Sequence, residues 1–210
     1  MGTLWLYAMP LDEVRAFFAA PAGLAEELLS QAADVMPDPT PSPLIGKVGP
    51  LFRRQVAPIM DLPVPTSADA RALVAGRALP PDRLGPAWVI VRHWCDVRSR
   101  ARLTMDVELQ QLASLDFCLV SRGLSSQYST ETVLTRDPHL PLRPLAGLKI
   151  GWMPNHHVAQ AFAQWRDAIA GCDVPDSALV PLRDQLAGFF GRFPEFSGQT
   201  PPPDVLAMYQ

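Results

Sequence analysis

Lysine is almost absent from this chain, since only two of its 18 basic residues are lysines, Lys47 and Lys149, and the formal net charge is −3. A nucleic-acid-binding protein is expected to show a clear basic excess. No stretch approaches the roughly 18 apolar residues of a membrane-spanning helix. We therefore expect neither a nucleic acid nor a membrane as a partner.

Cysteine is scarce, and its spacing forms no motif. The three cysteines, Cys95, Cys118 and Cys172, are far apart, and no CxxC pair occurs. This pattern argues against a disulfide scaffold and against a structural zinc site. We expect free, buried thiols in a reducing compartment. The amino-terminal stretch also lacks the basic segment of a signal peptide, so the sequence predicts a cytoplasmic protein.

The motifs of the common enzyme classes are missing. The sequence contains no Walker loop, GxGxxG, HExxH, GxSxG or kinase signature. We therefore expect no cofactor and no bound metal, and the sequence does not decide whether the protein is an enzyme.

Proline, in contrast, is abundant. The 23 prolines cluster between periodic segments, for example in the stretch MPDPTPSP at residues 36–43, and such clusters form rigid, extended connections. The length of 210 residues and the hydrophobic content of 48% suit one globular domain over residues 1–210.

The apolar pattern predicts short strands among about six helices. A helix is expected from Thr104 to Leu115, and Val205–Tyr209 is expected to form an edge strand. Because the elements do not alternate strictly, the predicted class is α+β with a small mixed sheet. The other predicted strands are residues 3–9, 116–121, 130–135 and 148–153.

The stretch at residues 145–171 carries the first candidate site. It reads as a strand, a turn, and an amphipathic helix with Asn155 as its N-cap. His156 and His157 would then occupy the first two helical positions, where the helix dipole favours neutral imidazole. A neutral imidazole can act as a base or bind a metal, so both histidines are catalytic candidates. Neighbouring side chains on a helix diverge by about 100°, so a metal would need a third ligand such as His93 or His139.

The second candidate site is the long polar loop that begins at Arg122. Long polar loops often carry binding residues. The candidates for contact with a ligand or partner are Arg122, Ser125, Ser126, Gln127 and Tyr128. A separate basic cluster, an alternative anion site, comprises Arg92, Arg98, Arg100 and Arg102.

Several segments resemble a known group of proteins. The opening LWLYAMPLDEVRAFF resembles the start of YfbM-like and related uncharacterised bacterial, including actinobacterial, proteins. The stretches LDFCLVSRGL, IGWMPNHHV and DVLAMY are similar in order and character to segments of such a relative. The resemblance implies an immunity-type or accessory protein and assigns no functional residues.

Two hypotheses follow. The first is a cytoplasmic protein that binds a partner protein, as an interaction protein or an immunity-type accessory factor. The second is a small enzyme or small-molecule-binding protein that uses His156 or His157 beside an arginine-lined anion site. A flat apolar patch would favour the first hypothesis, and a pocket enclosing His156 would favour the second.

Overall fold

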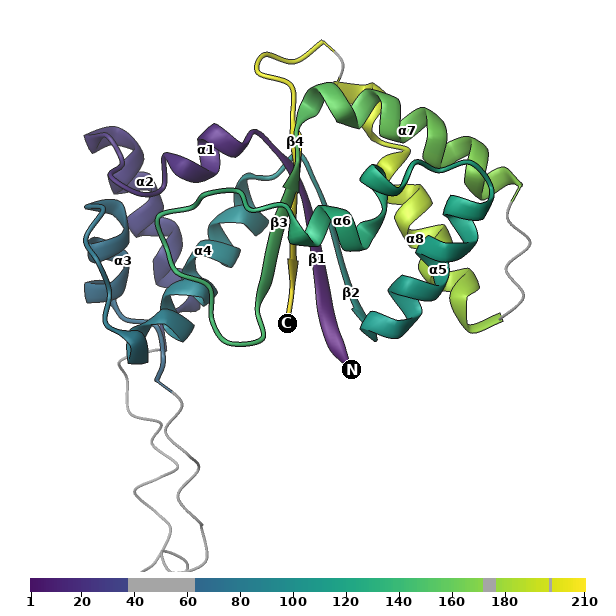
Figure 1. Cartoon of the computed structure of the whole chain (residues 1–210). Helices are drawn as coiled ribbons and strands as arrows, with labels where there is room; N and C mark the ends of the chain where they lie inside the picture. Colours follow the sequence, from purple (N-terminus) through teal and green to yellow (C-terminus); the bar gives the residue numbers. More distant parts are fainter. Residues whose placement is uncertain (38–62, 172–176, 197) are drawn as a thin grey trace, which may run out of the picture. The chain divides into compact units, whose positions relative to one another are not determined.

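A computed structural model of the chain describes residues 1–37, 63–171, 177–196 and 198–210. These residues form eight α-helices and a four-stranded sheet, which confirms the predicted α+β class (Figure 1). Within these ranges, no helix combines the length and apolar character needed to cross a membrane. The predicted connector at residues 36–43 falls largely outside the described residues, and Cys172 falls wholly outside them.

The chain divides into two compact units, which are described separately. The larger unit comprises Met1–Ala16 and Cys95–Gln210, and the smaller unit comprises Phe17–Trp94. The expectation of a single domain over residues 1–210 stays a prediction.

The sheet of the larger unit is antiparallel throughout, where we expected a mixed sheet. Its order is β2-β1-β4-β3. We had predicted that the C-terminal strand β4 forms an edge of the sheet. It lies inside the sheet instead, between β1 and β3. All six residues of β4 are buried, and apolar residues on both faces are typical of an inner strand. The strands are β1 (Gly2–Met9), β2 (Ala101–Val107), β3 (Lys149–Met153) and β4 (Asp204–Tyr209).

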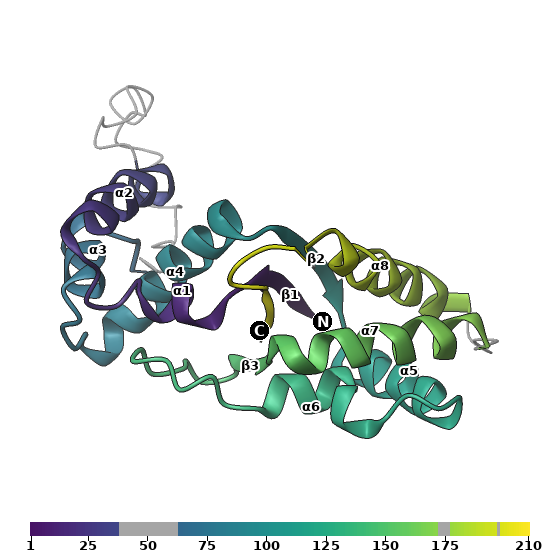
Figure 2. The same ribbon diagram turned by 90° about the horizontal axis from the view of Figure 1, so that it is seen from above.

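Four helices form a layer against one face of this sheet (Figures 1 and 2). Because side chains alternate along a strand, Leu4, Leu6 and Ala8 of β1 all point into the core shared with the helices. In this layer α7 lies between α8 and α5, and α5 lies at the margin (Figure 2). The helices are α5 (Leu109–Ser121), α6 (Thr130–Thr135), α7 (Asn155–Ala170) and α8 (Val180–Phe190).

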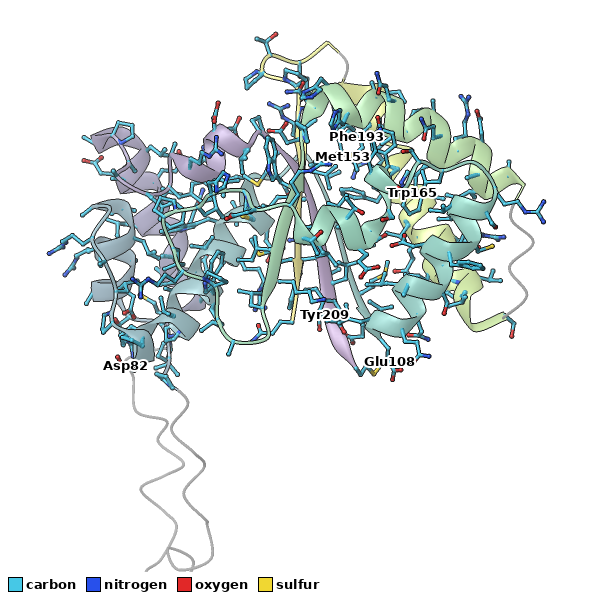
Figure 3. All side chains as sticks on the ribbon, viewed as in Figure 1. Asp82, Glu108, Met153, Trp165, Phe193 and Tyr209 are labelled. Atoms are coloured by element: carbon cyan, nitrogen blue, oxygen red, sulfur yellow. The ribbon has the colours of Figure 1, made fainter. Side chains whose placement is uncertain are left out.

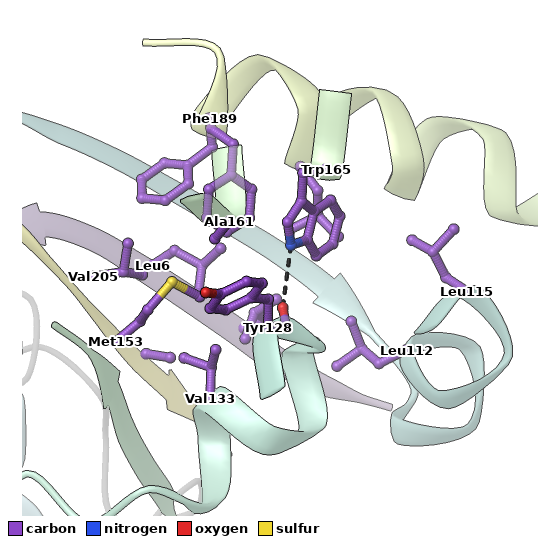
Figure 4. Packing of buried hydrophobic residues seen from close by; sticks show 14 of the residues in the cluster. Leu6, Leu112, Leu115, Tyr128, Val133, Met153, Ala161, Trp165, Phe189 and Val205 are labelled. Atoms are coloured by element: carbon purple, nitrogen blue, oxygen red, sulfur yellow. Dashed lines mark hydrogen bonds between the residues drawn. The ribbon is translucent and has the colours of Figure 1, made fainter. Parts of the chain in front are cut away.

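Aromatic packing joins α7 to α8 within this core. The rings of Trp165 and Phe190 are stacked, with centroids 4.8 Å apart, and both side chains are buried. Figure 4 shows Trp165 above Tyr128, and Phe189 meets Phe190 edge-on in the same core. The predicted strand at residues 148–153 and the helix that follows are thus confirmed, and their apolar residues build the core as expected.

Two predicted strands are helical instead. Residues 116–121 belong to α5, and residues 130–135 form α6. The buried residues Leu112, Leu115 and Leu119 recur at helical spacing through the first segment, and their burial outweighs the strand propensity of its apolar residues. The helix expected from Thr104 begins only at Leu109, because Ala101–Val107 pairs with β1 as strand β2.

Gly151 permits the close approach of α6 to β3. A Cβ atom at this position would lie 1.8 Å from the carbonyl oxygen of Val133. Only glycine leaves the α6 backbone room to lie directly on the strand. This contact fixes the position of α6 against β3, the strand that leads into the helix with the histidines.

Two buried aspartates hold helix starts from other parts of the chain. Asp204 accepts hydrogen bonds from the backbone N–H groups of Leu11, at 2.6 Å, and Asn155, at 2.7 Å. Asp116 likewise accepts from Thr130 and Glu131, at 3.0 and 2.9 Å. Each carboxylate therefore satisfies donors that a helix start leaves free. Asn155 is not the N-cap we predicted, because Pro154 holds that position and Asp204 accepts the Asn155 N–H.

The smaller unit is helical. The buried Trp94 donates from Nε1 to the carbonyl of Leu28, at 2.9 Å, and its ring meets Phe17 edge-on. Thr66 caps α3 in a capping box with Asp69, which also forms an ion pair with Arg83. The helices that contribute are α2 (Ala22–Ala32), α3 (Ser67–Val74) and α4 (Leu84–Arg98), of which α4 continues past Trp94. The short helix α1 (Leu11–Arg15) belongs to the larger unit.

Candidate functional site

Tyr128 connects the two sites that the sequence predicts. It ends a short 3₁₀ turn, Ser126–Tyr128, and its side chain is buried. Its hydroxyl donates to Gln160 Oε1 at 2.7 Å, and its ring meets that of His157 edge-on with centroids 5.8 Å apart. Its carbonyl accepts from Trp165 Nε1 at 3.1 Å (Figure 4). The polar loop therefore packs against α7, next to the histidines.

Ser125 makes a second tie between the loop and α7. Its backbone N–H donates to Gln164 Oε1 at 2.9 Å. The two glutamines, Gln160 and Gln164, are one helical turn apart on α7 and so present their amides to the loop together. The neighbouring Ser126 and Gln127 are exposed. Tyr128 is therefore buried in contacts within the protein, whereas Ser126 and Gln127 are accessible from outside, and their role in binding stays a prediction.

His157 is held as a neutral imidazole. Its Nδ1 lies 3.3 Å from Nη1 of Arg136. Arginine has only donors, so Nδ1 accepts and the ring proton lies on Nε2. Burial, the neighbouring His156 and the Arg136 guanidinium all lower the pKa of His157. This agrees with the predicted charge state, although burial is the first cause and the histidines occupy the second and third helical positions.

His156 lies on the surface beside its neighbour. It is exposed, and the two imidazole rings contact each other with centroids 4.3 Å apart. Among the residues that the structure describes, no three His, Cys, Asp or Glu side chains gather to hold a metal. His139, one of the suggested third ligands, instead forms a pair with Asp137, with 3.2 Å between Nδ1 and Oδ2.

The arrangement of Arg136, His156 and His157 brings nitrogen donors together at the start of α7. Arg136 comes from the segment after α6, whose position depends on the contact with β3, and its carbonyl accepts from the N–H of Trp152 at 3.1 Å. Such a cluster can hold an anionic group, and the neutral His157 can donate through Nε2. Sequence reasoning missed Arg136 because the intervening strand and turn hide its proximity to His157.

The arginine cluster proposed from the sequence is engaged locally. Arg100 lies 3.7 Å from Glu13 and donates to the carbonyl of Pro201 at 2.7 Å. Arg102 lies 3.6 Å from Asp96. Arg100 stands in the turn before strand β2 and Arg102 on that strand, whereas Arg92 and Arg98 belong to α4.

The exposed side of α5 is a second surface, which the sequence analysis did not identify. Phe117 is 79% exposed, and Leu109 and Val120 are also exposed on this helix. The only charged residue of α5 is Asp116, which is buried. We call this uncharged surface the α5 outer face, and its residues are Leu109, Gln110, Ala113, Ser114, Phe117, Val120 and Ser121.

A cavity of about 730 Å³ opens on the α5 outer face. Ala113, Ser114 and Phe117 line it, and Leu179 contributes from the turn before α8. Arg122, which the sequence analysis assigned to the polar loop site, lines this cavity as well. Arg122 is the C-cap of α5 and therefore belongs to the end of that helix.

The cysteines differ from one another in their chemistry. Cys95 is a free, fully buried thiol, and burial raises its pKa. Cys118 on α5 is disulfide-bonded, so the prediction of a free, inert thiol is wrong at this position. The sulfur of Cys118 is consequently not a nucleophile.

Comparison of the chain with protein-family models, with curated proteins and with solved structures finds no match in any of the three. The resemblance to YfbM-like proteins therefore stays a prediction.

Proposed function

We propose that this is an interaction protein and that it binds a partner protein through the α5 outer face. The observation that carries the proposal is the exposure of Phe117 at the centre of an uncharged helix face. Charged residues are depleted at the centre of protein interfaces, and aromatic residues are enriched there. A buried aromatic anchor in a pocket is also the usual source of binding energy.

The partner sought is a protein that offers an apolar knob or groove to Phe117 and the adjoining cavity. An immunity-type accessory role is the finer form of the proposal, and it rests on the resemblance to YfbM-like proteins. This finer form predicts a partner whose activity falls when the complex forms, whereas a purely structural contact leaves that activity unchanged.

The expected cytoplasmic location also stays a proposal, and the disulfide at Cys118 counts against it. Reducing compartments keep thiols reduced, and disulfides persist mainly in oxidising ones. Rapid alkylation of the protein inside cells, followed by mass spectrometry, decides this point. Alkylated Cys118 supports the cytoplasm, and protected Cys118 supports an oxidising compartment.

The test of the interaction compares the wild-type protein with Phe117→Ser. Because Phe117 is largely exposed, this change leaves the fold intact. We expect a stoichiometric partner, identified by mass spectrometry, to bind the purified wild-type protein directly and to bind Phe117→Ser at least about 30-fold more weakly. Asp167→Ala, a change on the exposed side of α7, serves as the control and leaves the affinity unchanged. Equal binding by the wild type and Phe117→Ser would remove the α5 outer face as the contact surface.

A second candidate function is the binding of a small molecule with an anionic group at Arg136 and His157. The 3.3 Å approach of Arg136 Nη1 to His157 Nδ1 favours it, because it holds the guanidinium beside the ring. An anion next to the pair would accept hydrogen bonds from the remaining guanidinium N–H groups and from Nε2–H of His157. NMR titration with inorganic phosphate and with simple carboxylates tests this function through the ring signals of His156 and His157. Saturable shifts that disappear in Arg136→Gln support an anion site, and unchanged ring signals rule it out.

A further inference from the structure

The two edges of the sheet in the larger unit differ in how the chain covers them. At the β3 edge, the N–H of Trp152 donates to the carbonyl of Arg136, at 3.1 Å. The opposite edge is β2, which pairs with β1 over seven consecutive residues without a bulge. β2 also contains no proline, and bulges and prolines are two of the devices that keep an edge strand from pairing. The β2 edge therefore has the form of a strand that can accept another.

The hydrogen-bond pattern of the sheet shows which backbone groups of β2 point outward. Thr3 and Gln210 exchange two backbone hydrogen bonds, of 2.7 and 3.1 Å, so Thr3 and its alternate neighbours in β1 bond to β4. The remaining β1 residues bond to β2, and the register places them opposite Leu103 and its alternate neighbours. In agreement, the carbonyl of Val107 accepts from the hydroxyl of Tyr209 on β4, at 3.1 Å, and Tyr209 is labelled in Figure 3. The outward residues of β2 are therefore Arg102, Thr104 and Asp106.

These outward groups have no partner in the described part of the chain. Among residues 1–37, 63–171, 177–196 and 198–210, no hydrogen bond involves the backbone N–H or C=O of Arg102, Thr104 or Asp106. A row of unpaired N–H and C=O groups at a sheet edge is a template for a further strand.

We infer that the β2 edge binds the β2 edge of a second copy of this chain. The two strands pair antiparallel about a two-fold axis at Thr104, and the two sheets join into one continuous sheet. A two-fold contact uses one patch twice, so the patch must complement itself. The β2 edge is distinct from the α5 outer face, and the inference does not depend on the proposed function.

Charge complementarity specifies this register. With the axis at Thr104, Arg102 of each copy lies opposite Asp106 of the other. Both side chains are exposed, and they point to the sheet face away from the helix layer, because the alternate residues of β2 belong to the core. Unlike charges on directly opposed residues stabilise a strand pair. The outward backbone groups of the opposed residues also meet, so each pair can exchange two hydrogen bonds.

Displaced registers are less favourable. An axis at Arg102 or at Asp106 would place two like charges opposite each other, which destabilises a strand pair. Thr104 is the central residue of β2 (Ala101–Val107), so only the register centred on Thr104 pairs the strand along its full length.

The present contacts of the two charged side chains are surface contacts. Arg102 is 60% exposed, and its Nη1 lies 3.6 Å from Oδ1 of Asp96. Asp106 accepts from Oγ1 of Thr3 at 2.7 Å, also in an exposed position. Exposed ion pairs contribute little to stability, and a carboxylate can accept several hydrogen bonds. Pairing with a second copy therefore does not require a buried contact to break.

The size of the contact predicts a reversible dimer. A single strand pair buries less than the roughly 800 Å² per partner of a standard stable interface. Helix α8 packs on β2, so the α8 helices of the two copies would extend the contact on the helix side of the joint sheet. The dimer should therefore form and dissociate with concentration.

Sedimentation equilibrium and amide hydrogen exchange on the same samples provide the first test. The wild type is expected to pass from monomer to dimer as its concentration rises. Over the same range, the amides of Arg102, Thr104 and Asp106 should exchange at least about 10-fold more slowly, because the dimer protects them. The amides of Leu103 and Met105, which already bond to β1, should stay protected throughout.

Thr104→Pro tests the edge itself. Proline removes only an outward N–H at this position, and edge strands tolerate such a proline, so the fold should persist. The dissociation constant should rise at least about 30-fold, because the two hydrogen bonds at the axis are lost. Thr104→Val keeps the N–H and a β-branched side chain, and it should leave the constant unchanged, as should Phe117→Ser on α5. Circular dichroism confirms that the variants are folded.

A charge exchange tests the register without a proline. Arg102→Glu and Asp106→Lys each place two like-charged pairs in the homodimer, so each variant alone should dimerise roughly 10-fold more weakly. An equimolar mixture of the two variants restores both attractive pairs, and it should form a heterodimer with nearly wild-type affinity. This rescue cannot come from a change in the stability of either chain.

Three results would overturn the inference: a wild type that stays monomeric, a dimer unaffected by Thr104→Pro, or a mixture that does not associate better than its components. If Thr104→Pro does not fold, the charge exchange alone decides. A dimer lost in Phe117→Ser and kept in Thr104→Pro would place the contact on α5 and overturn the β2 edge. A monomeric wild type would leave the proposed function standing, since that function concerns a different surface.

Discussion

Helices α5 and α7 belong to the same core, but their exposed sides differ in kind. α7 presents His156 and an ion pair between Arg166 and Asp167, whose side chains are 65% and 71% exposed. α5 presents no charge, and Phe117 stands 79% exposed at its centre. Scattered apolar side chains are normal on a surface, but a continuous uncharged helix face with an aromatic centre is not. The charged side chains of α7 are typical of a helix face that stays in contact with solvent. The uncharged outer face of α5 has the composition of a contact surface.

The largest predicted difference concerns two aromatic side chains, one on each helix. Trp165→Ala on α7 removes a buried indole and its hydrogen bond to Tyr128, and it should lower the free energy of unfolding by about 3–5 kcal/mol. Phe117→Ala on α5 should change it by less than about 0.5 kcal/mol, when measured at concentrations where the chain is monomeric. Urea denaturation of both variants checks this. Comparable losses would show that Phe117 packs inside the monomer and would break the comparison.

The next-largest predicted difference in stability is between substitutions of Asp116 on α5 and Asp167 on α7. Asp116→Ala on α5 leaves the N–H groups of Thr130 and Glu131 without their acceptor, and it should cost about 2–3 kcal/mol. Asp167→Ala on α7 removes one member of an exposed ion pair, and exposed pairs contribute less than about 1 kcal/mol. Thermal unfolding of the two variants, side by side, makes the measurement. Equal shifts in Tm would contradict the account of Asp116 as the acceptor that holds α6.

The smallest predicted effect is an opposite pH dependence for the two helices. Burial raises the pKa of Asp116 above its ordinary 3.8, against the hydrogen bonds from Glu131 and Thr130 that lower it. The folded state therefore holds this proton more tightly than the unfolded chain, and stability is lost as the pH rises from 3.8 through the raised pKa. The pKa of His157 is lowered from 6.5, so its contribution is present above pH 6.5 and is lost as the pH falls through the lowered pKa.

The variants Asp116→Asn and His157→Gln test these two signs. Unfolding free energies should be measured from acid to neutral pH, and each variant compared with the wild type. Asp116→Asn should remove a decline of stability with rising pH in the acid range. His157→Gln should remove a rise of stability toward neutral pH. A reversed sign for either variant would show that its partners in the folded state differ from those described here.

The strand–helix unit around the histidines could be predicted because several local signals agree there. A short apolar strand, a Pro–Asn turn and a stripe of buried residues at helical spacing all point to β3 and α7. The cap was predicted wrongly because the acceptor, Asp204, comes from a strand 49 residues further along the chain. Local sequence contains no signal for such a partner.

The segments on either side of the polar loop were predicted wrongly for a related reason. Residues 116–121 contain the apolar and β-branched types typical of strands, and the helical spacing of Leu112, Leu115 and Leu119 crosses the predicted boundary. Residues 130–135 form a helix because Ser129 and Asp116 accept the N–H groups at its start. Tertiary contacts decide both segments.

The candidate sites show the same division. The sequence identified the histidines and the polar loop separately. The structure shows that the rings of Tyr128 and His157 meet, with centroids 5.8 Å apart, and that Arg136 lies next to His157. The α5 outer face did have a signal in the sequence, because thirteen consecutive residues contain a single charge. That signal was missed because half of the segment was assigned to a strand.

Site-specific photo-crosslinking tests the central claim, that α5 and not α7 is the contact surface, most directly. A photoreactive amino acid is placed at position 117 on α5 and, in a matched protein, at the exposed position 163 on α7. We predict that position 117 forms a covalent adduct with another polypeptide in high yield, and that position 163 forms none above background. Equal yields from both positions, or a crosslink from position 163 alone, would contradict the account.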